Sequence, residues 1–153
     1  MEQALLPLLF AYVGMAIMLA MGCCGSAAGV TIVGNTTLGA LRKNPDMYGQ
    51  GLILSAIPAT QGLYSFAGFF LMLNAIKGLT SPLTQSQGLA MFAASISLGF
   101  AAFFSARRQA SICANGVTEI GNGRDVFGKT LILAVFPELY AILAFAATFL
   151  ALP

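Results

Sequence analysis

The sequence contains one stretch that occurs twice: DMYGQGLILSAIPA at residues 46–59 aligns without a gap with DVFGKTLILAVFPE at residues 125–138. The offset between the two stretches is 79 residues, and the same offset places Ser26 on Ser105. Similarity at one fixed offset is typical of a repeated structural unit. We therefore interpret the chain as two copies of one unit in tandem.

Each unit is long enough for two membrane-spanning helices. Of the 153 residues, 58% are hydrophobic and 8% are charged, against about 25% charged in ordinary soluble domains. Charge-free stretches cover residues 3–41, 47–76, 78–106 and 130–153, the last interrupted only by Glu138. Each exceeds the roughly 20 residues that a helix needs to cross a bilayer. The sequence predicts an all-α membrane protein with four transmembrane helices.

The repeat predicts how these helices are grouped. We expect residues 1–77 to form a first transmembrane hairpin and residues 78–153 to form a second, which carries Glu138. Two spans per unit leave both units in the same orientation across the membrane. Parallel hairpins can stand side by side, and we expect identical chains to continue the arrangement as a homo-oligomeric ring.

Basic residues predict the orientation of the protein in the membrane. Arg42 and Lys43 lie in the first turn, Arg124 and Lys129 flank the third, and the second loop offers only Lys77. By the positive-inside rule, the first and third loops face the cytoplasm and both termini face outside. We expect a multi-pass integral protein of a plasma membrane.

The composition disfavours several classes of function. The chain has 3 Cys, no His and no C-x-x-C pair, so we expect no cofactor and no thiolate or imidazole metal centre. A net charge of +2 is too small to indicate a nucleic-acid partner. No G-x-x-x-x-G-K-S/T phosphate-binding loop is present. We expect no catalytic residue, so the chain does not hydrolyse ATP by itself.

Glu138 is an acid within an otherwise apolar segment. At the repeat offset it falls opposite Ala59, so its function is present once per chain. An ionised carboxylate at the centre of a membrane helix costs at least about 2.5 kcal/mol, and such groups are usually functional. The sequence predicts that Glu138 is the working residue of the protein.

Other polar residues lie at the same height in the predicted bundle. Gln109 and Glu138 are nearly equally far from the third turn, and a count from the first turn brings Thr60, Gln61 and Tyr64 close to that height. Buried polar groups need partners, so we expect these residues to contact one another and an ion. Oxygen ligands with one negative charge favour Na⁺ or H⁺ over Ca²⁺.

Two prolines occupy equivalent places in the second and fourth predicted helices. Pro58 and Pro137 each remove a backbone donor and bend a helix. The carbonyl oxygens that this leaves free are potential cation ligands. A bend without any role in ion binding is the other interpretation, and the sequence leaves both open.

Three segments carry the most specific patterns of the sequence: PATQGLY at residues 58–64, FFSARRQASICANG at residues 103–116 and PELYAILAF at residues 137–145. They resemble a known family, the membrane rotor subunit or proteolipid of V-type and A-type ATPases in its fused four-helix form. They are most similar to the bacterial sodium-translocating version. The resemblance covers nearly the whole chain and implies a bacterial plasma membrane.

The resemblance also implies a ligand set for Na⁺ or H⁺. Glu138, Gln109, Thr60 and Gln61 would contribute side chains, Ile57 would contribute its backbone carbonyl, and Tyr64 would donate a hydrogen bond to Glu138 that closes the site. The chain departs from the family pattern at Ala59, where Gly is commoner, and at Arg107 and Arg108 beside Gln109. None of these departures removes an implied ligand.

Partners follow from the same resemblance. They are identical subunits in a ring, the lipid bilayer, a stator membrane subunit that supplies an arginine, and a central-stalk subunit of the motor. Two other functions remain open from the residues alone: a passive cation channel or small secondary transporter built on the same hairpins, and a membrane scaffold with a vestigial acid.

Overall fold

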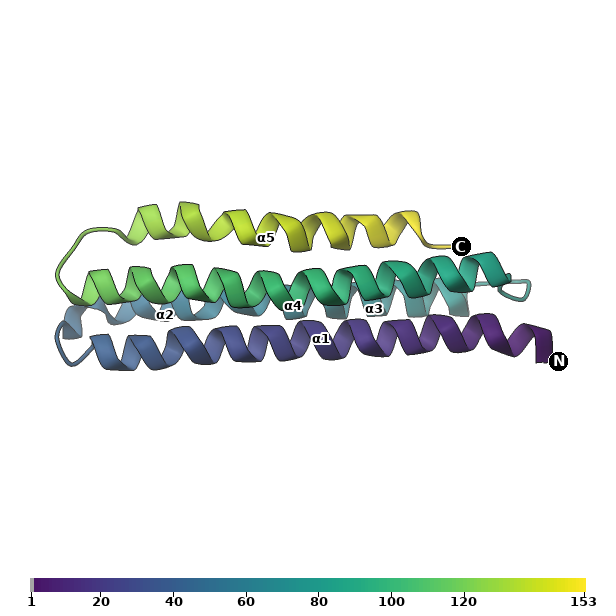
Figure 1. Ribbon diagram of the computed structural model, residues 1–153, viewed down its shortest axis with the longest axis horizontal. Helices are drawn as coiled ribbons and strands as arrows, with labels where there is room; N and C mark the ends of the chain where they lie inside the picture. Colours follow the sequence, from purple (N-terminus) through teal and green to yellow (C-terminus); the bar gives the residue numbers. More distant parts are fainter. Residues whose placement is uncertain (1) are drawn as a thin grey trace.

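The computed structural model describes residues 2–153, with side chains from residue 5 onward, and forms an elongated helical bundle (Figure 1). The first long helix, α1, spans Glu2–Ala40. The second span consists of η1 (Pro45–Met47), α2 (Tyr48–Ala56), η2 (Ile57–Ala59) and α3 (Thr60–Lys77). The second half of the chain forms α4 (Gln85–Gly121) and α5 (Phe127–Leu150). Four segments are long and apolar enough to cross a membrane, which confirms the predicted fold class.

The two halves of the chain run in the same direction. In Figure 1, α1 and α4 lie side by side and parallel, and the second span and α5 run back in the opposite direction. The turns at residues 41–44 and 122–126 lie at one end, and both termini lie at the other. A hydrogen bond of 3.2 Å from Lys43 Nζ to Asn122 Oδ1 joins the two turns. These two residues are themselves related by the repeat offset of 79.

The two prolines affect their helices differently. Pro58 lies in the short 3₁₀ turn η2, which interrupts the second span between α2 and α3. Pro137 lies inside α5, which continues through it as an α-helix. A proline removes one ladder bond in either case, but only the turn at Pro58 changes the winding, just before Thr60 and Gln61 at the start of α3.

Buried residues form two apolar clusters along the bundle axis. One lies toward the turns and includes Val33, Leu54 and Val117, and the other lies toward the termini and includes Met15, Met72 and Leu98. Buried polar side chains occupy the same bundle, and Ser26, Gln61, Ser65, Ser105 and Gln109 are among them. These polar side chains come from the same helices that supply both apolar clusters. The core therefore contains polar as well as apolar layers.

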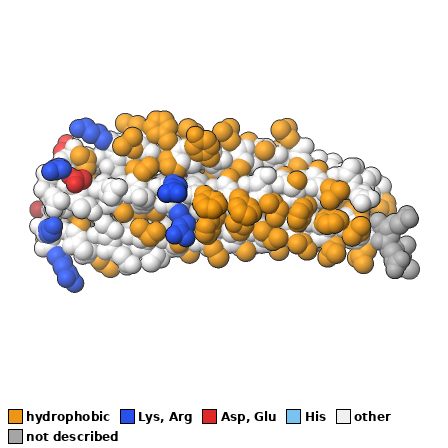
Figure 2. Space-filling view, in the orientation of Figure 1, with side chains coloured by type: hydrophobic (Ala, Val, Ile, Leu, Met, Phe, Trp, Pro, Cys, Tyr) orange, Lys and Arg blue, Asp and Glu red, His pale blue; other side chains and the backbone are white. Residues whose placement is uncertain are grey.

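Charges concentrate at the end of the bundle that carries the two turns. Figure 2 shows basic and acidic side chains gathered at that end, and a broad hydrophobic surface over much of the remaining length. Further basic side chains lie midway along this face. Arg107 and Arg108 are both exposed on α4, and the Cζ atom of Arg107 lies 5.5 Å from the centroid of the Phe103 ring.

Candidate ion-binding site

Glu138 projects from α5 to a point where it contacts both α3 and α4. Tyr64 Oη donates a hydrogen bond of 2.8 Å to Glu138 Oε1, and Gln109 Nε2 donates one of 3.0 Å to Glu138 Oε2. The carboxylate is half-buried. Each carboxylate oxygen therefore accepts one bond from a different neighbouring helix, and the structure brings Gln109 and Glu138 to the same height.

Gln109 connects the carboxylate to the centre of the bundle. This residue is fully buried, and its Nε2 also donates to the backbone oxygen of Ala134 at 2.9 Å. Its Oε1 accepts a hydrogen bond of 2.9 Å from Gln61 Nε2. Tyr64, Glu138, Gln109 and Gln61 thus form one continuous hydrogen-bonded chain across α3, α4 and α5.

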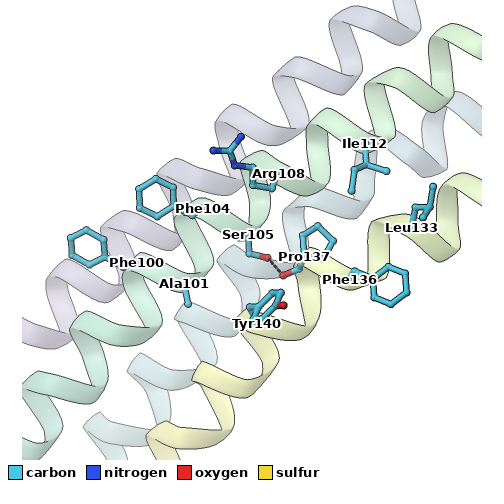
Figure 3. A pocket seen from close by; sticks show the side chains of 10 residues that line it. All are labelled: Phe100, Ala101, Phe104, Ser105, Arg108, Ile112, Leu133, Phe136, Pro137 and Tyr140. Atoms are coloured by element: carbon cyan, nitrogen blue, oxygen red, sulfur yellow. Dashed lines mark hydrogen bonds between the residues drawn. The ribbon is translucent and has the colours of Figure 1, made fainter.

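Ser105 belongs to the same network, although the sequence analysis did not select it. Its hydroxyl accepts a hydrogen bond of 3.0 Å from Gln61 Nε2 and donates one of 2.8 Å to the Pro137 carbonyl, the bond that Figure 3 marks by a dashed line. Ser105 lies four residues before Gln109 and so shares its helix face. Two features of the sequence could have pointed to Ser105: this four-residue spacing from Gln109, and the alignment of Ser105 with Ser26 at the repeat offset.

Thr60 and Ile57 lie beside this network and bond to each other. Thr60 Oγ1 donates to the Ile57 carbonyl at 3.1 Å, and the same carbonyl accepts the backbone N–H of Thr60. No hydrogen bond within residues 2–153 joins either residue to Glu138. Thr60 and Ile57 therefore lie in the same span as Gln61, but neither of them is hydrogen-bonded to the Glu138 carboxylate.

One acceptor in the network has no donor. Gln61 is fully buried, and its Nε2 donates to both Gln109 and Ser105. Its Oε1 is buried and has no hydrogen-bond partner among the described residues. An unsatisfied buried acceptor costs about 1–3 kcal/mol. A cation or a hydrogen-bond donor at this point would remove that cost.

The ligand types at this layer restrict which metal ions could fit. The described residues contain no group of three or more His, Cys, Asp or Glu side chains that could hold a metal. Any ion beside Glu138 would therefore be held by one carboxylate and by neutral oxygens. Such a set suits a monovalent cation better than Ca²⁺ or a transition metal.

Comparison with known proteins identifies the family. A family model that describes the C subunit of ATP synthase matches the chain twice, over residues 13–72 and 92–151. The two matches are related by the same offset as the sequence repeat. The chain belongs to the ATP synthase C-subunit family. Within this family it has the fused form, with two units in one chain.

Two known proteins that are similar to this chain have names that are more specific than the family description. The chain is 34% identical over 144 residues to V-type sodium ATPase subunit K of Enterococcus hirae, covering 94% of this chain and 90% of the relative. It is 32% identical over 136 residues to A-type ATP synthase subunit K of Methanocaldococcus jannaschii, covering 89% of this chain and 58% of the relative. These relatives confirm the resemblance to the proteolipids of V-type and A-type ATPases.

Membership of the C-subunit family establishes the general role of the chain. The family consists of ring-forming membrane rotor subunits of ATPases, which are not catalytic themselves. Four apolar helices and these relatives make the chain an integral membrane protein. The division at residue 77, the bacterial origin, and the side of the membrane that each loop faces stay predictions.

Proposed function

We propose that this chain is the ion-binding subunit of a rotor ring and carries Na⁺ across the membrane by reversible binding at Glu138. Gln109, Gln61 and Thr60 contribute side-chain oxygens, and Ile57 contributes its carbonyl. Tyr64 closes the site. The observation that carries the proposal is the buried Gln61 Oε1, an acceptor without a donor in the same hydrogen-bonded layer as the one intramembrane carboxylate.

Electrostatics explains how such a site serves rotation. An ionised Glu138 facing lipid costs at least about 2.5 kcal/mol, and a bound cation neutralises it. The ring then turns with its sites neutral. An arginine of a stator subunit pairs with the emptied carboxylate, and a central stalk transmits the motion. Na⁺ is favoured because the first relative named above is a sodium ATPase subunit, and H⁺ is the alternative cargo.

Carbodiimide labelling tests both the acid and the ion. We expect a hydrophobic carbodiimide to modify Glu138 in isolated rings, because the reagent reacts with protonated carboxyl groups in apolar surroundings. Na⁺ is expected to suppress the labelling in a saturable way, whereas K⁺ at equal concentration is not. The measurement is the mass of the peptide that contains Glu138, followed over a Na⁺ titration at fixed pH.

The outcomes of this titration separate the competing functions. Labelling that Na⁺ does not suppress would contradict the sodium assignment and leave a proton-carrying ring. The absence of labelling at Glu138 would contradict the role of this residue altogether. Passive Na⁺ flux through liposomes that contain the purified chain without its motor would favour a channel.

Replacement of Tyr64 by phenylalanine tests the closing hydrogen bond. Tyr64→Phe removes the 2.8 Å bond to Glu138 Oε1, and a bond to a charged group contributes about 1.5–3 kcal/mol. We therefore expect Na⁺ protection to require at least about tenfold more Na⁺. The readout is the midpoint of the same titration.

Tyr140→Phe is the matched control. Tyr140 lies on α5 two residues after Glu138, is 70% exposed, and makes no hydrogen bond within the described part of the chain. Its removal should leave the midpoint unchanged. An equal shift in both variants would mean that the hydroxyl of Tyr64 has no specific function.

A further inference from the structure

Two acceptors on α5 fix the orientation of the Gln109 side chain. A side-chain amide has two N–H donors on its nitrogen and one acceptor oxygen. The Nε2 atom of Gln109 donates to the Ala134 carbonyl at 2.9 Å and to Glu138 Oε2 at 3.0 Å. Both of its hydrogens are therefore used on α5. The other end of the amide, Oε1, is left to accept a hydrogen bond from α3.

The orientation of Gln61 follows from that of Gln109. Two amide oxygens that face each other at hydrogen-bond distance repel, so Gln61 must present its nitrogen to Gln109 Oε1. Its Nε2 donates to this oxygen at 2.9 Å and to Ser105 Oγ at 3.0 Å. Both hydrogens of Gln61 are again used. Its Oε1 is then the one polar atom of these three side chains without a partner among the described residues.

Ser105 can accept the bond from Gln61 because its own proton is used elsewhere. A hydroxyl carries one hydrogen and two lone pairs, and Ser105 Oγ donates its hydrogen to the Pro137 carbonyl at 2.8 Å (Figure 3). A hydroxyl that rotated freely could also donate to the oxygen of Gln61. The Pro137 carbonyl removes this option, so Ser105 selects the nitrogen of Gln61 and not its oxygen.

We propose that Ser105 is a positioning residue of the ion site and holds the Gln61 amide in the orientation that presents Oε1 to a cation. The proposal deepens the proposed function and rests on it, because it concerns Na⁺ binding beside Glu138. Ser105 acts through Gln61 and contributes no ligand of its own. Its hydroxyl connects the Pro137 carbonyl on α5 to the amide on α3.

Loss of the Ser105 hydroxyl would release the Gln61 amide. One buried N–H of Gln61 would lose its acceptor, which is unfavourable in a site that excludes water. The amide would then be held by Gln109 alone and could rotate about that single bond. A neutral oxygen helps to bind a cation only while it points at the ion. Removal of a group that orients a metal ligand typically lowers metal affinity about 10–100-fold.

The equivalent serine of the first unit has a different partner. Ser26 aligns with Ser105 at the repeat offset, and its Oγ accepts a hydrogen bond of 2.7 Å from the backbone N–H of Gly62. Ser26 thus holds the backbone of α3 one residue after Gln61, whereas Ser105 holds the Gln61 side chain. The orientation of the amide therefore depends on Ser105 and not on Ser26.

Proton binding at Glu138 does not need the oxygen of Gln61. The two carboxylate oxygens accept hydrogen bonds from Tyr64 and Gln109, and no hydrogen bond within residues 2–153 joins Gln61 to Glu138. A proton neutralises the carboxylate directly, whereas a hard metal ion also needs several neutral oxygens around it. Loss of the Ser105 hydroxyl should therefore weaken Na⁺ binding and leave H⁺ binding unchanged.

Ser105→Ala in rings of the full-length chain tests the inference through two midpoints. The first is the Na⁺ concentration that halves carbodiimide labelling of Glu138 at fixed pH, and we expect it to rise at least about tenfold. The second is the pH at which labelling is half-maximal without Na⁺, and we expect no change. An unchanged Na⁺ midpoint would overturn the inference. A shift of both midpoints would also overturn it, because a general loss of structure affects both ions.

Two further variants show whether the hydroxyl of Ser105 is the group that acts. Ser105→Thr keeps a hydroxyl that can donate and accept, and it should retain most of the Na⁺ affinity. Ser95→Ala is the matched control, since Ser95 is also buried on α4 but donates to Met72 Sδ at 3.2 Å. Both midpoints should stay unchanged in this control. Equally weak Na⁺ binding in Ser105→Thr and Ser105→Ala would contradict the role of the hydroxyl.

A chain that carries Gln61→Ala shows whether Ser105 acts through Gln61. This chain has no amide to hold, so the addition of Ser105→Ala should not shift the Na⁺ midpoint further. Coupling of this kind is what a double-mutant cycle measures. A further shift as large as that in the unmodified chain would overturn the positioning role. If Gln61→Ala rings bind no measurable Na⁺, the comparison of Ser105→Ala with Ser105→Thr decides.

The failure of this inference can be distinguished from the failure of the proposed function. If Na⁺ protects unmodified rings and Ser105→Ala rings at the same midpoint, Ser105 has no positioning role and the proposed function stands. If Na⁺ does not protect unmodified rings, the sodium assignment fails, and the inference fails with it. Native mass spectrometry checks that each variant forms rings. If Ser105→Ala does not, Ser105→Cys, whose sulfur is a weak acceptor, takes its place.

Discussion

Glu138→Gln is expected to abolish ion transport by the assembled motor while leaving the ring intact. The substitution removes the one negative charge at the site but keeps an oxygen that can accept the hydrogen bond from Tyr64. Two unit charges 4 Å apart interact by about 4 kcal/mol at an effective dielectric constant of 20. We therefore expect Na⁺ affinity to fall at least about 1,000-fold. ATP-driven Na⁺ uptake into liposomes that contain the whole complex should fall to background.

Glu119→Gln is the matched control for this experiment. Glu119 lies near the end of α4 and forms a solvent-exposed ion pair with Arg124, and such pairs contribute about 0–1 kcal/mol to stability. Its variant should transport Na⁺ at the rate of the unmodified complex. Uptake that persists in Glu138→Gln would show that another group carries the ion.

Gly25→Ala is expected to lower the stability of the ring more than a methyl group added at an open position of α1. The added Cβ would lie 2.6 Å from Phe103 Cα and 3.0 Å from its carbonyl oxygen. Both are backbone atoms, so the contact cannot be relieved by rotating a side chain, and the helices must move apart. Overpacking of this kind costs about 1–3 kcal/mol. Unfolding of the purified ring in detergent, followed by circular dichroism against temperature, measures the loss.

Gly39→Ala provides the comparison within the same helix. A Cβ atom at Gly39 meets no other atom within 4 Å, and alanine favours a helix by about 1 kcal/mol over glycine. We expect this variant to be as stable as the unmodified ring or slightly more stable. Equal loss in both variants would mean that close approach at Gly25 is not required.

The positions of the spans could be predicted from the sequence because the membrane restricts the chain so strongly. A helix is the only way for an isolated segment to satisfy its backbone groups in hydrocarbon. The charge-free stretches therefore predicted the number of spans, and the turns fixed the relative heights of residues on neighbouring helices. The contact between Gln109 and Glu138 follows from this simple geometry. The third stretch ended at residue 106, whereas α4 continues to Gly121 and includes Arg107 and Arg108.

The directions of the side chains could not be predicted in the same way. Thr60, Gln61 and Tyr64 all lie near the required height, but height alone does not determine which partner each side chain meets. Tyr64 reaches Glu138, and Gln61 points to Gln109 and Ser105. Thr60 instead turns back to the Ile57 carbonyl. The height of a residue in the bundle depends only on its position in the sequence. The direction of its side chain depends also on the local winding of the helix and on the neighbouring residues that pack against it.

The sequence by itself determined the four helices, the duplication, the family, and the single acid that stands where the first unit has Ala59. These properties are local or repetitive, and they can be read without knowing which helices touch. Only the tertiary structure decided that Gln61 Oε1 lacks a donor and that Ser105 joins the network. Each of these depends on atoms from separate helices meeting within a few ångströms, which packing decides and residue order does not.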